Sequence, residues 1–474
     1  MRNIYKVICA LMFSCLSAYS QQDSATIAKG ERLLNLGYGI TVKARESSAA
    51  ISEVTGDEMM KSAAMNPLNA LFGKGLGLTV LQNGGTIWEN APSVSIRGLN
   101  SIRNNSILVL IDGFERDLSM ITKEEIESVQ VLKDAAATAL YGLRGSNGVL
   151  LVTTRTGSKK KIDINVNYEH HFNMLNRLPE FADGYTYALA MNEAMKNDGL
   201  SPMYDQTQLE GIKNHDPHYG NVNWMDEVLS KSGSTDNVFV TLSGGGKLVR
   251  YFSSIDYLSY KGFVKPDNIV DDYSSQYKYS KLSIRTNIDV DMTKSTLLSF
   301  KMNGMLSEHN RPYPVANDLM GMLYNTPAAA FPIKTPYGDW GGSNVWTRNP
   351  LAEVVAKGYS RSHQRMLFAD MAIRQDLGML LKGLSADVRI AYDNLGEYWD
   401  NYGMKYAYSV PNVSHPSSSE DYTLKGESTS ATFDSSLGRQ WSRFNLWGRV
   451  NYNNAWNHHK LDATLALSRE QTIL

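Results

Sequence analysis

The side chains that most often perform chemistry in proteins give little support for an active site in this sequence. Nine histidines are present, including the adjacent His170 and His171, but none stands in a metal-ligand pattern such as H-E-x-x-H. Neighbouring residues on a strand point to opposite faces, so an adjacent pair does not readily form one site. We therefore predict a protein that is not an enzyme, with no catalytic residue, no metal and no cofactor.

The glycine-rich stretch at residues 141–148 could hold a phosphate only if it preceded a helix. In phosphate cradles the first amide groups of that helix bind the anion. Here an alanine-rich helical segment precedes the glycines, and the β-branched segment 149–154 follows them. We therefore predict that Gly142, Gly145 and Gly148 end a helix and form a tight turn that requires positive φ.

The first twenty residues have the composition of an export signal. A basic start is followed by an apolar stretch at 7–16 and a small-x-small triplet that ends at Ser20. The apolar stretch is too short to span a membrane, so we predict cleavage after Ser20. The two cysteines, Cys9 and Cys15, both lie in this segment. The mature protein would therefore contain no disulfide and no thiolate metal site.

Overall charge and hydropathy exclude several classes of protein. The 47 lysines and arginines nearly balance the 48 aspartates and glutamates, so no net field would attract nucleic acid. Beyond residue 20 no uncharged apolar run of about 18 residues occurs, which argues against a spanning helix in the mature chain. Membrane-spanning strands are still possible, because polar and apolar residues alternate in them and no long apolar run is needed.

Residues 40–157 are predicted to form a small α+β domain. Short apolar strands are expected near 93–97, 107–111, 128–132 and 149–154. Helical spacing predicts a helix over 57–71, with Asp57 as its N-cap. Asp134 is predicted to cap the alanine-rich helix that precedes the glycine-rich turn. Asp112 and Gly113 form a turn dipeptide, and we favour a turn over a binding site there.

Residues 158–474 alternate between apolar and polar side chains, which is typical of strands. Between 282 and 292, for example, Arg285 and Asp289 fall between apolar neighbours. Tight turns alternate with long connections, and aromatic residues gather near the strand ends, as in transmembrane barrels. A soluble β-sandwich also alternates and is the alternative fold. The predicted strands lie near 161–172, 234–243, 247–262, 278–291, 294–307, 363–377, 383–395, 441–454 and 459–470.

These roughly nine strands cannot form a complete membrane barrel around a plugging domain. A barrel must close to satisfy its edge hydrogen bonds in lipid, and one of about eight strands has a lumen filled by its own side chains. We therefore expect an incomplete membrane β-barrel, about nine strands of an expected 22 or so, with an N-terminal α+β domain. The chain is expected to be a truncated or split product.

Several segments resemble the plug domain of TonB-dependent outer-membrane receptors, in particular the SusC and RagA group of Bacteroidetes-type bacteria. They lie at residues 95–98, 108–114, 126–142 and 147–154, in the order and spacing of that family. The plug-motif residues are Arg97, Gly98, Asp112, Gly113, Asp134, Gly142, Gly145, Asn147 and Gly148. Upstream, Leu34, Asn35, Leu36, Gly37, Tyr38 and Gly39 resemble the TonB box and the segment after it.

The resemblance implies four regions. They are a signal peptide at 1–20, an N-terminal segment with the TonB-box-like stretch at 21–39, a plug domain at 40–157 and the first part of a transmembrane β-barrel at 158–474. It places the protein in the outer membrane of a Gram-negative bacterium with its plug facing the periplasm. Arg97 is the residue that we expect to form an ion pair between plug and barrel wall, with a plain surface arginine as the alternative.

The function implied is TonB-dependent import of a nutrient. TonB, with its inner-membrane motor proteins, would pair with the N-terminal box by β-augmentation and rearrange the plug. A SusD-like surface lipoprotein and outer-membrane lipid would be further partners, and the substrate would be an oligosaccharide, a glycan fragment or a peptide. The alternative is a soluble exported β-sandwich binding protein without transport activity.

Overall fold

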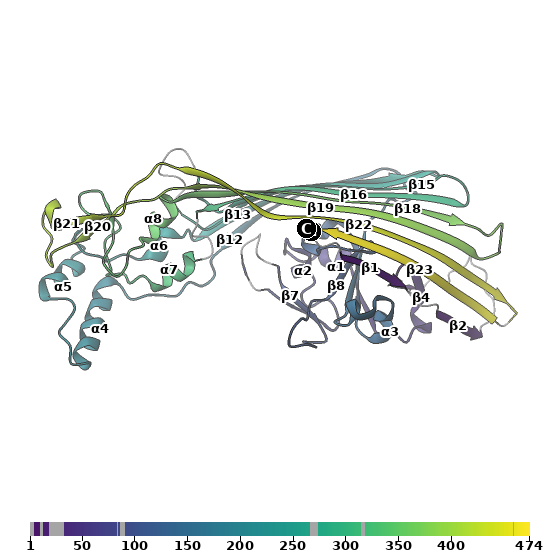
Figure 1. The fold of residues 1–474 in the computed structure, drawn as a ribbon, viewed down its shortest axis with the longest axis horizontal. Helices are drawn as coiled ribbons and strands as arrows, with labels where there is room; N and C mark the ends of the chain where they lie inside the picture. The colour runs from purple at the N-terminus through teal and green to yellow at the C-terminus, as the bar shows by residue number, and fades with distance from the viewer. Residues whose placement is uncertain are drawn as a thin grey trace.

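The protein consists of one long antiparallel sheet with a compact domain under one of its faces (Figure 1). The structure is a computed structural model that describes residues 4–9, 13–18, 33–82, 84–85, 91–265, 274–313, 318–457 and 459–474. The N-terminal domain lies beneath one half of the sheet, and a group of short helices lies at the other end (Figure 1). This arrangement fits the predicted N-terminal domain beside part of a barrel wall, but among the described residues the sheet does not close.

The N-terminal domain is built on a mixed sheet in the order β5-β10-β11-β8-β9, in which β11 and β8 are parallel. Its strands are β3 (Leu33–Gly37), β4 (Ile40–Lys43), β5 (Ile51–Thr55), β6 (Leu78–Leu81), β7 (Ser93–Ile96), β8 (Leu108–Ile111), β9 (Phe114–Glu115), β10 (Ile126–Leu132) and β11 (Val149–Thr154), and its helices are α1 (Gly56–Met60), α2 (Pro67–Ala70) and α3 (Ala135–Thr138). Val129 and Leu150 are fully buried within it, in a core that packs without the large sheet. The domain therefore has a hydrophobic core of its own.

The helix predicted over 57–71 is wrong in its cap and in its length. Thr55, not Asp57, is the N-cap, and it forms a capping box in which the Glu58 carboxylate accepts a hydrogen bond from the Thr55 amide at 2.9 Å. The helix ends after one turn, and α2 starts afresh with Asn66 as its N-cap. Pro67 prevents one helix from running through 57–71, because proline has no N–H and disfavours helical backbone in the residue before it. α1 itself already ends at Met60.

The large sheet has 11 strands, namely the nine that the alternation predicted plus β1 and β2. The nine are β12 (Asp163–Met174), β13 (Ser232–Gly245), β14 (Val249–Lys261), β15 (Lys278–Asp291), β16 (Thr296–Pro312), β18 (Gly358–Asp376), β19 (Leu384–Gly403), β22 (Thr432–Trp456) and β23 (His459–Ile473). They pair antiparallel in chain order, apart from β17, β20 and β21, which lie outside this sheet. This is the pattern of an up-and-down barrel wall.

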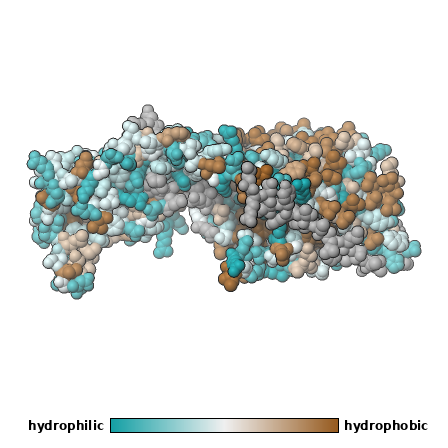
Figure 2. All heavy atoms as spheres, viewed as in Figure 1, coloured by the Kyte–Doolittle hydropathy of each residue, from teal (hydrophilic) through white to brown (hydrophobic). Residues whose placement is uncertain are grey.

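The sheet is apolar on its outer face and polar on the face toward the N-terminal domain. Ile255, Ile284 and Ile390 are 48%, 43% and 36% exposed, whereas their neighbours in sequence Ser254 and Arg285 are 1% and 2% exposed. Figure 2 shows apolar residues gathered over the strands above the N-terminal domain and more polar ones at the opposite end. A sandwich would bury its apolar face against a second sheet, so the exposed apolar face favours the barrel wall over the sandwich alternative.

Several strands run further than the alternation predicted, and β18, β19 and β22 are examples. β18 begins at Gly358, β19 continues to Gly403 and β22 begins at Thr432, where the predictions were 363, 395 and 441. Backbone pairing continues in these extensions. In β22 both faces meet water, because all side chains at 432–440 are exposed, whereas the extension of β18 buries the polar Ser360 and Ser362. The period-two signal is lost there because neither face needs to be apolar.

The predicted signal peptide also pairs with the sheet. β1 (Ile4–Cys9) and β2 (Phe13–Ala18) both lie antiparallel to β23, the last strand. An edge strand offers unpaired N–H and C=O groups that any extended segment can satisfy. The pairing is therefore compatible with a leader that is later removed, and cleavage after Ser20 stays a prediction.

A layer of short elements caps the end of the sheet away from the N-terminal domain (Figure 1). It comprises α4 (Gly184–Asn197), α5 (Gln206–Lys213), α6 (Trp224–Val228), α7 (Leu319–Asn325), α8 (Pro350–Val355), β17 (Trp340–Gly341), β20 (Tyr408–Pro411) and β21 (Tyr422–Lys425). Trp224, Phe331 and Val354 form part of its core. None of the helices in the described residues has the length and apolar character needed to cross a membrane.

An arginine on the outer face should destabilise the folded sheet if lipid covers that face. We expect Ile284→Arg to lower the free energy of unfolding by about 2–4 kcal/mol, because a charge near the bilayer midplane is poorly solvated. Urea midpoints of the protein in lipid vesicles would measure the loss. The matched control is Met292→Arg in the turn after β15, where the side chain is 60% exposed. Equal effects of the two substitutions would contradict a lipid-facing surface.

Candidate functional site

The N-terminal domain contacts the inner face of the sheet mainly through buried ion pairs, and this interface is the candidate site. The first pair joins Glu125 to β15. Thr122 precedes a single helical turn, and its amide donates to the Glu125 carboxylate, which fixes that side chain toward the sheet. Arg285 Nε donates to Glu125 Oε2 at 3.0 Å, and the Ser254 hydroxyl donates to Oε1 at 3.1 Å. Glu125 is 0% exposed, so this carboxylate is satisfied entirely by protein.

The second pair is formed at the turn between β8 and β9. Asp112 and Gly113 have φ of 54° and 96°, so the predicted turn dipeptide does occupy a turn. Asp112 also contacts the sheet, because Lys301 Nζ lies 2.8 Å from its Oδ1, and the Thr154 hydroxyl donates to Oδ2 at 2.6 Å. Burial alone would raise the pKa of Asp112, but the Lys301 ammonium outweighs it and holds that pKa well below its usual range.

The third contact is a buried arginine that lies between two carboxylates. Arg116 donates to Asp393 Oδ1 at 2.7 Å and to Asp370 Oδ2 at 2.9 Å, and its side chain is 2% exposed. Its guanidinium also lies over the rings of Phe114 and Phe368, at 5.2 and 4.9 Å from their centroids. Sequence reasoning missed Arg116, since nothing in its local pattern marks it.

Arg97, the residue predicted to make such a pair, does not make it in the described part of the chain. Arg97 has φ of 58° and Gly98 has φ of 88°, and both are exposed in the turn that follows β7. Because Arg97 is exposed, the alternative prediction of a surface arginine fits the structure better. Arg116, and not Arg97, makes the ion pair between plug and barrel wall.

The other motif residues build the plug rather than a pocket. Asp134 caps α3, with its carboxylate accepting from the Ala137 amide at 2.8 Å. Gly142 and Gly148 have φ of 54° and 95°. A Cβ on Gly148 would lie 2.6 Å from Ile96 Cδ1, so only glycine fits there. Gly145 lies in the same turn. The side-chain amide of Asn147 donates to the Asn104 carbonyl at 3.1 Å, which ties the turn to the segment before β8.

The TonB-box-like residues Leu34–Gly39, which we call the strap, lie between plug and sheet instead of extending freely. The strap includes most of β3, which pairs with β4. The Tyr141 hydroxyl of the plug donates to the Leu36 carbonyl at 2.7 Å, and Arg449 of β22 donates to the Tyr38 carbonyl at 3.0 Å. The Tyr38 ring stacks on Tyr141 at 5.6 Å and meets Trp447 edge-on at 6.1 Å. The strap therefore joins the plug to the wall.

Glu124 is an acidic group at the same interface without a strong partner. Its side chain is 11% exposed, and Lys123 Nζ is 3.8 Å from its Oε1. Burial raises the pKa of Glu124 to about 7, and Lys123 only partly opposes the rise. The interface thus contains a carboxyl that changes charge near neutral pH.

The described residues contain no group of three or more His, Cys, Asp or Glu side chains arranged to bind a metal. The histidine doublet predicted to make no site is split across the β12 strand. His170 Nδ1 lies 2.7 Å from Asp236 Oδ1, and His171 Nε2 lies 3.1 Å from Glu169 Oε2. What the interface can do chemically is exchange ion pairs and hydrogen bonds.

Comparison with known proteins identifies the N-terminal domain and the fold. Residues 43–149 match the family model described as TonB-dependent Receptor Plug Domain. TonB-dependent receptor P3 of Formosa agariphila is 31% identical over 331 residues, which cover 70% of this chain and 30% of that receptor. TonB-dependent receptor SusC of Bacteroides thetaiotaomicron is 31% identical over 250 residues, which cover 50% of this chain and 23% of SusC. The chain thus matches less than a third of the length of these relatives.

A solved structure supports the same fold for the plug and the sheet together. The RagAB peptide importer in the "closed-closed" state aligns with a TM-score of 0.68 and 16% identity, over 90% of this chain and 48% of that one. At this identity the likeness concerns the fold alone. The names of these relatives describe receptors and an importer, not enzymes. Together with the inward polar face and the plug that neutralises it, these matches show that the chain belongs to the TonB-dependent receptors of the SusC/RagA type.

Proposed function

We propose that the protein imports a nutrient across the outer membrane with energy supplied through TonB. The observation that carries this proposal is the polar contact between plug and wall. Glu125–Arg285, Asp112–Lys301 and Arg116–Asp393 are all charge-assisted contacts that water can replace when the plug moves. A plug held in this way can be displaced without exposing its apolar core.

The apolar contacts across the interface support the same conclusion, because they are small. One cluster joins Phe114 of the plug to Ala391 and Trp447 of the wall, and in a second one Met120 is the plug residue that packs against buried side chains of the wall. By contrast, the plug buries Val54, Met59 and many further side chains in a core of its own. Displacement would therefore cost little hydrophobic free energy at the wall, while the plug itself stays folded.

We propose that TonB acts through the N-terminal segment that contains the strap. The strap already forms a strand, and a strand edge can pair with a partner strand by β-augmentation. Its present contacts with Tyr141, Trp447 and Arg449 would have to break first. The regions proposed for this mechanism are the signal peptide 1–20, the segment 21–39, the plug 40–157 and the barrel part 158–474.

The proposed orientation follows from the lengths of the connections. Tight turns lie at the plug end of the sheet, and the connections that carry α4–α8 lie at the other end (Figure 1). We place the long connections outside the cell and the plug toward the periplasm, as the asymmetry of outer-membrane barrels suggests. A SusD-like lipoprotein would dock on this outer layer, and the substrate would be an oligosaccharide, glycan fragment or peptide.

Uptake measurements in cells test the proposed function. Cells that make the protein should accumulate a labelled oligosaccharide or peptide from a defined panel, and deletion of TonB or an uncoupler should abolish accumulation. The protein should fractionate with the outer membrane. Uptake that is unchanged without TonB, or recovery of the folded protein in the soluble periplasmic fraction, would contradict the proposal.

Removing Glu125 should loosen the plug. We expect Glu125→Gln to weaken plug seating by about 3–5 kcal/mol, because Arg285 would be left buried without its carboxylate partner. The reporter is Ala391→Cys, since Ala391 is 0% exposed against Phe114, and the chain's two cysteines both lie in the predicted signal. The maleimide labelling rate of this cysteine should rise about 100-fold or more.

The control for this experiment lies on the neighbouring strand of the plug. Glu127 is exposed at the start of β10, so Glu127→Gln removes the same charge without breaking a buried pair. Its labelling rate should equal that of the parent. If Glu125→Gln and Glu127→Gln label at the same rate, the ion pair does not hold the plug.

The plug should become easier to displace as pH rises through the range in which Glu124 loses its proton. The folded-state pKa is about 7 and the usual value is 4.5, so folding favours the protonated carboxyl. The cost of charging Glu124 is absent below pH 4.5 and fully present above pH 7, where it reaches roughly 3 kcal/mol. Glu124→Gln should abolish this loss and stabilise the plug at pH 8. Urea midpoints of plug release at pH 4.5 and 8 would measure it, and an identical pH dependence in both proteins would refute it.

A further inference from the structure

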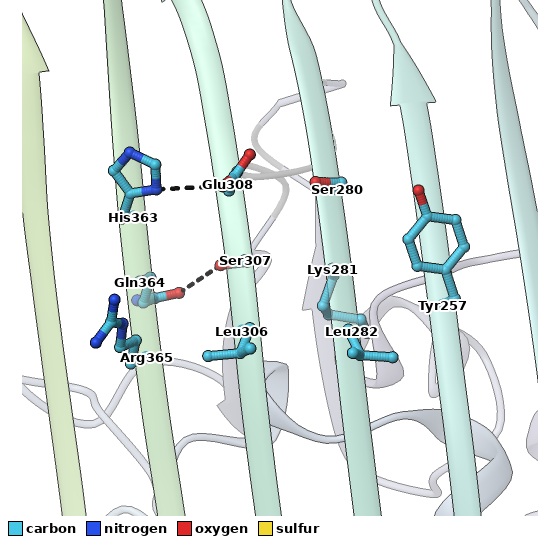
Figure 3. Close-up of a pocket in the computed structure, with 10 residues that line it drawn as sticks. All are labelled: Tyr257, Ser280, Lys281, Leu282, Leu306, Ser307, Glu308, His363, Gln364 and Arg365. Atoms are coloured by element: carbon cyan, nitrogen blue, oxygen red, sulfur yellow. Dashed lines mark hydrogen bonds and ion pairs between the residues drawn. The ribbon is translucent and has the colours of Figure 1, made fainter.

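A groove of about 240 Å³ lies on the outer face of the sheet, across β14, β15, β16 and β18 (Figure 3). Its outward-facing lining consists of Tyr257, Ser280, Leu282, Leu306, Glu308, His363 and Arg365. Leu306 and Tyr257 are 54% and 47% exposed, so the groove opens outward and not toward the plug. It belongs to the face that the alternating pattern assigns to lipid.

The groove lies where this face changes from apolar to polar. The strand register places Tyr257, Leu282, Leu306 and Arg365 side by side in one row. The next row toward the long connections consists of Ser259, Ser280, Glu308 and His363. The change from one row to the next marks the rim of the apolar band, which is where lipid headgroups begin. Arg365 is the one charged residue in the four-residue row that is otherwise apolar.

Arg365 forms no ion pair with any described residue, whereas the carboxylates of Glu308 and Asp400 beside it both contact His363. His363 Nδ1 lies 3.3 Å from Glu308 Oε1, and His363 Nε2 lies 3.5 Å from Asp400 Oδ2. On its other side Arg365 pairs with Gly396 of β19, which has no side chain to cover it. The guanidinium is exposed toward the bilayer with room around it.

We propose that this groove binds a phosphate-bearing lipid of the outer leaflet. The phosphate would accept hydrogen bonds from Arg365, and the start of an acyl chain would lie against Leu282 and Leu306. Arginine suits this role, because its planar guanidinium donates two parallel hydrogen bonds to phosphate oxygens. Glu308 lies in the neighbouring row beside the phosphate position, and Tyr257 lies at the other end of the groove, with β15 and β16 between it and Arg365. Both side chains can bind headgroup hydroxyls. A bilayer covers this face, so the occupant is a lipid, and the guanidinium of Arg365 makes it an anionic one.

This inference rests on the proposed function, since it requires an outer-membrane protein with its long connections outward. The test uses the full protein extracted from outer membranes in dodecyl maltoside. The probes are monophosphoryl lipid A and the same lipid without its phosphate, and native mass spectrometry measures the bound fraction. The parent protein should retain the phosphorylated lipid, and Arg365→Gln should reduce its bound fraction about 5-fold or more, with Arg365→Lys in between.

Two further variants separate charge from shape and from general effects. Leu306→Trp fills the groove without touching the charge and should also lower binding. Arg374→Gln removes an arginine from the far end of β18, where the side chain is 59% exposed, and should bind like the parent. Equal binding by Arg365→Gln and the parent, equal binding of the dephosphorylated lipid, or displacement of the lipid by millimolar inorganic phosphate would each overturn the lipid site.

Uptake assays on the same variants distinguish the failure of this site from the failure of the import function. TonB-dependent uptake by a parent protein that binds no lipid A overturns the lipid site and leaves import intact. Absence of the protein from the outer membrane overturns both. Loss of lipid binding in Arg365→Gln with normal uptake supports the site and shows that it is separate from transport.

Discussion

The charged inner face of the large sheet is the constraint on which the rest of the structure depends. Arg285 is 2% exposed and Asp393 is 0% exposed, although both project from a sheet whose other face is apolar. A charge removed from water costs several kcal/mol unless a partner of opposite sign is placed well. Glu125 and Arg116 are those partners. The polar face of the sheet thus determines where the plug lies. The plug in turn supplies the partners that offset the free-energy cost of burying these charges.

The division between an apolar plug core and a polar interface separates the stability of the plug from its attachment. Burial of residues such as Val129 and Leu150 holds the plug together without the wall. The wall contacts depend instead on ion pairs, which are specific in geometry and which water can replace. A domain attached in this way can leave its site as a folded unit. An apolar interface of similar size would favour a permanent assembly.

The sequence predicted the strands well because period two persists wherever one face of a strand is apolar, and it predicted the contacts poorly. Arg116 and Asp393 are 277 residues apart, and no local pattern connects them. Arg97 and Arg116 both follow a short strand, so sequence alone could not tell which one faces the wall. The extended ends of β18, β19 and β22 were missed because neither face carries a run of apolar residues there, so the alternation stops. The chemistry of proline predicts a break before Pro67, but the helical spacing of the apolar residues favoured a single helix over 57–71.

The strap determines the order in which contacts would yield to a pull on the N-terminal segment. Its bonds to the plug and wall are individual hydrogen bonds, from Tyr141 to the Leu36 carbonyl, from the Asn35 amide to the Gln130 side chain and from Arg449 to the Tyr38 carbonyl, beside the backbone pairing of β3 with β4. Such bonds contribute about 0.5–3 kcal/mol each, whereas separating one partner from a buried ion pair costs about 3–5 kcal/mol. A force on the strap therefore breaks the strap contacts before the ion pairs of Glu125 and Arg116. Because the strap continues along the chain into β4 of the plug, a freed strap would still pull on the plug. Under the proposed coupling to TonB, the graded polarity of these contacts would convert one pull into two successive steps, detachment of the strap and then displacement of the plug.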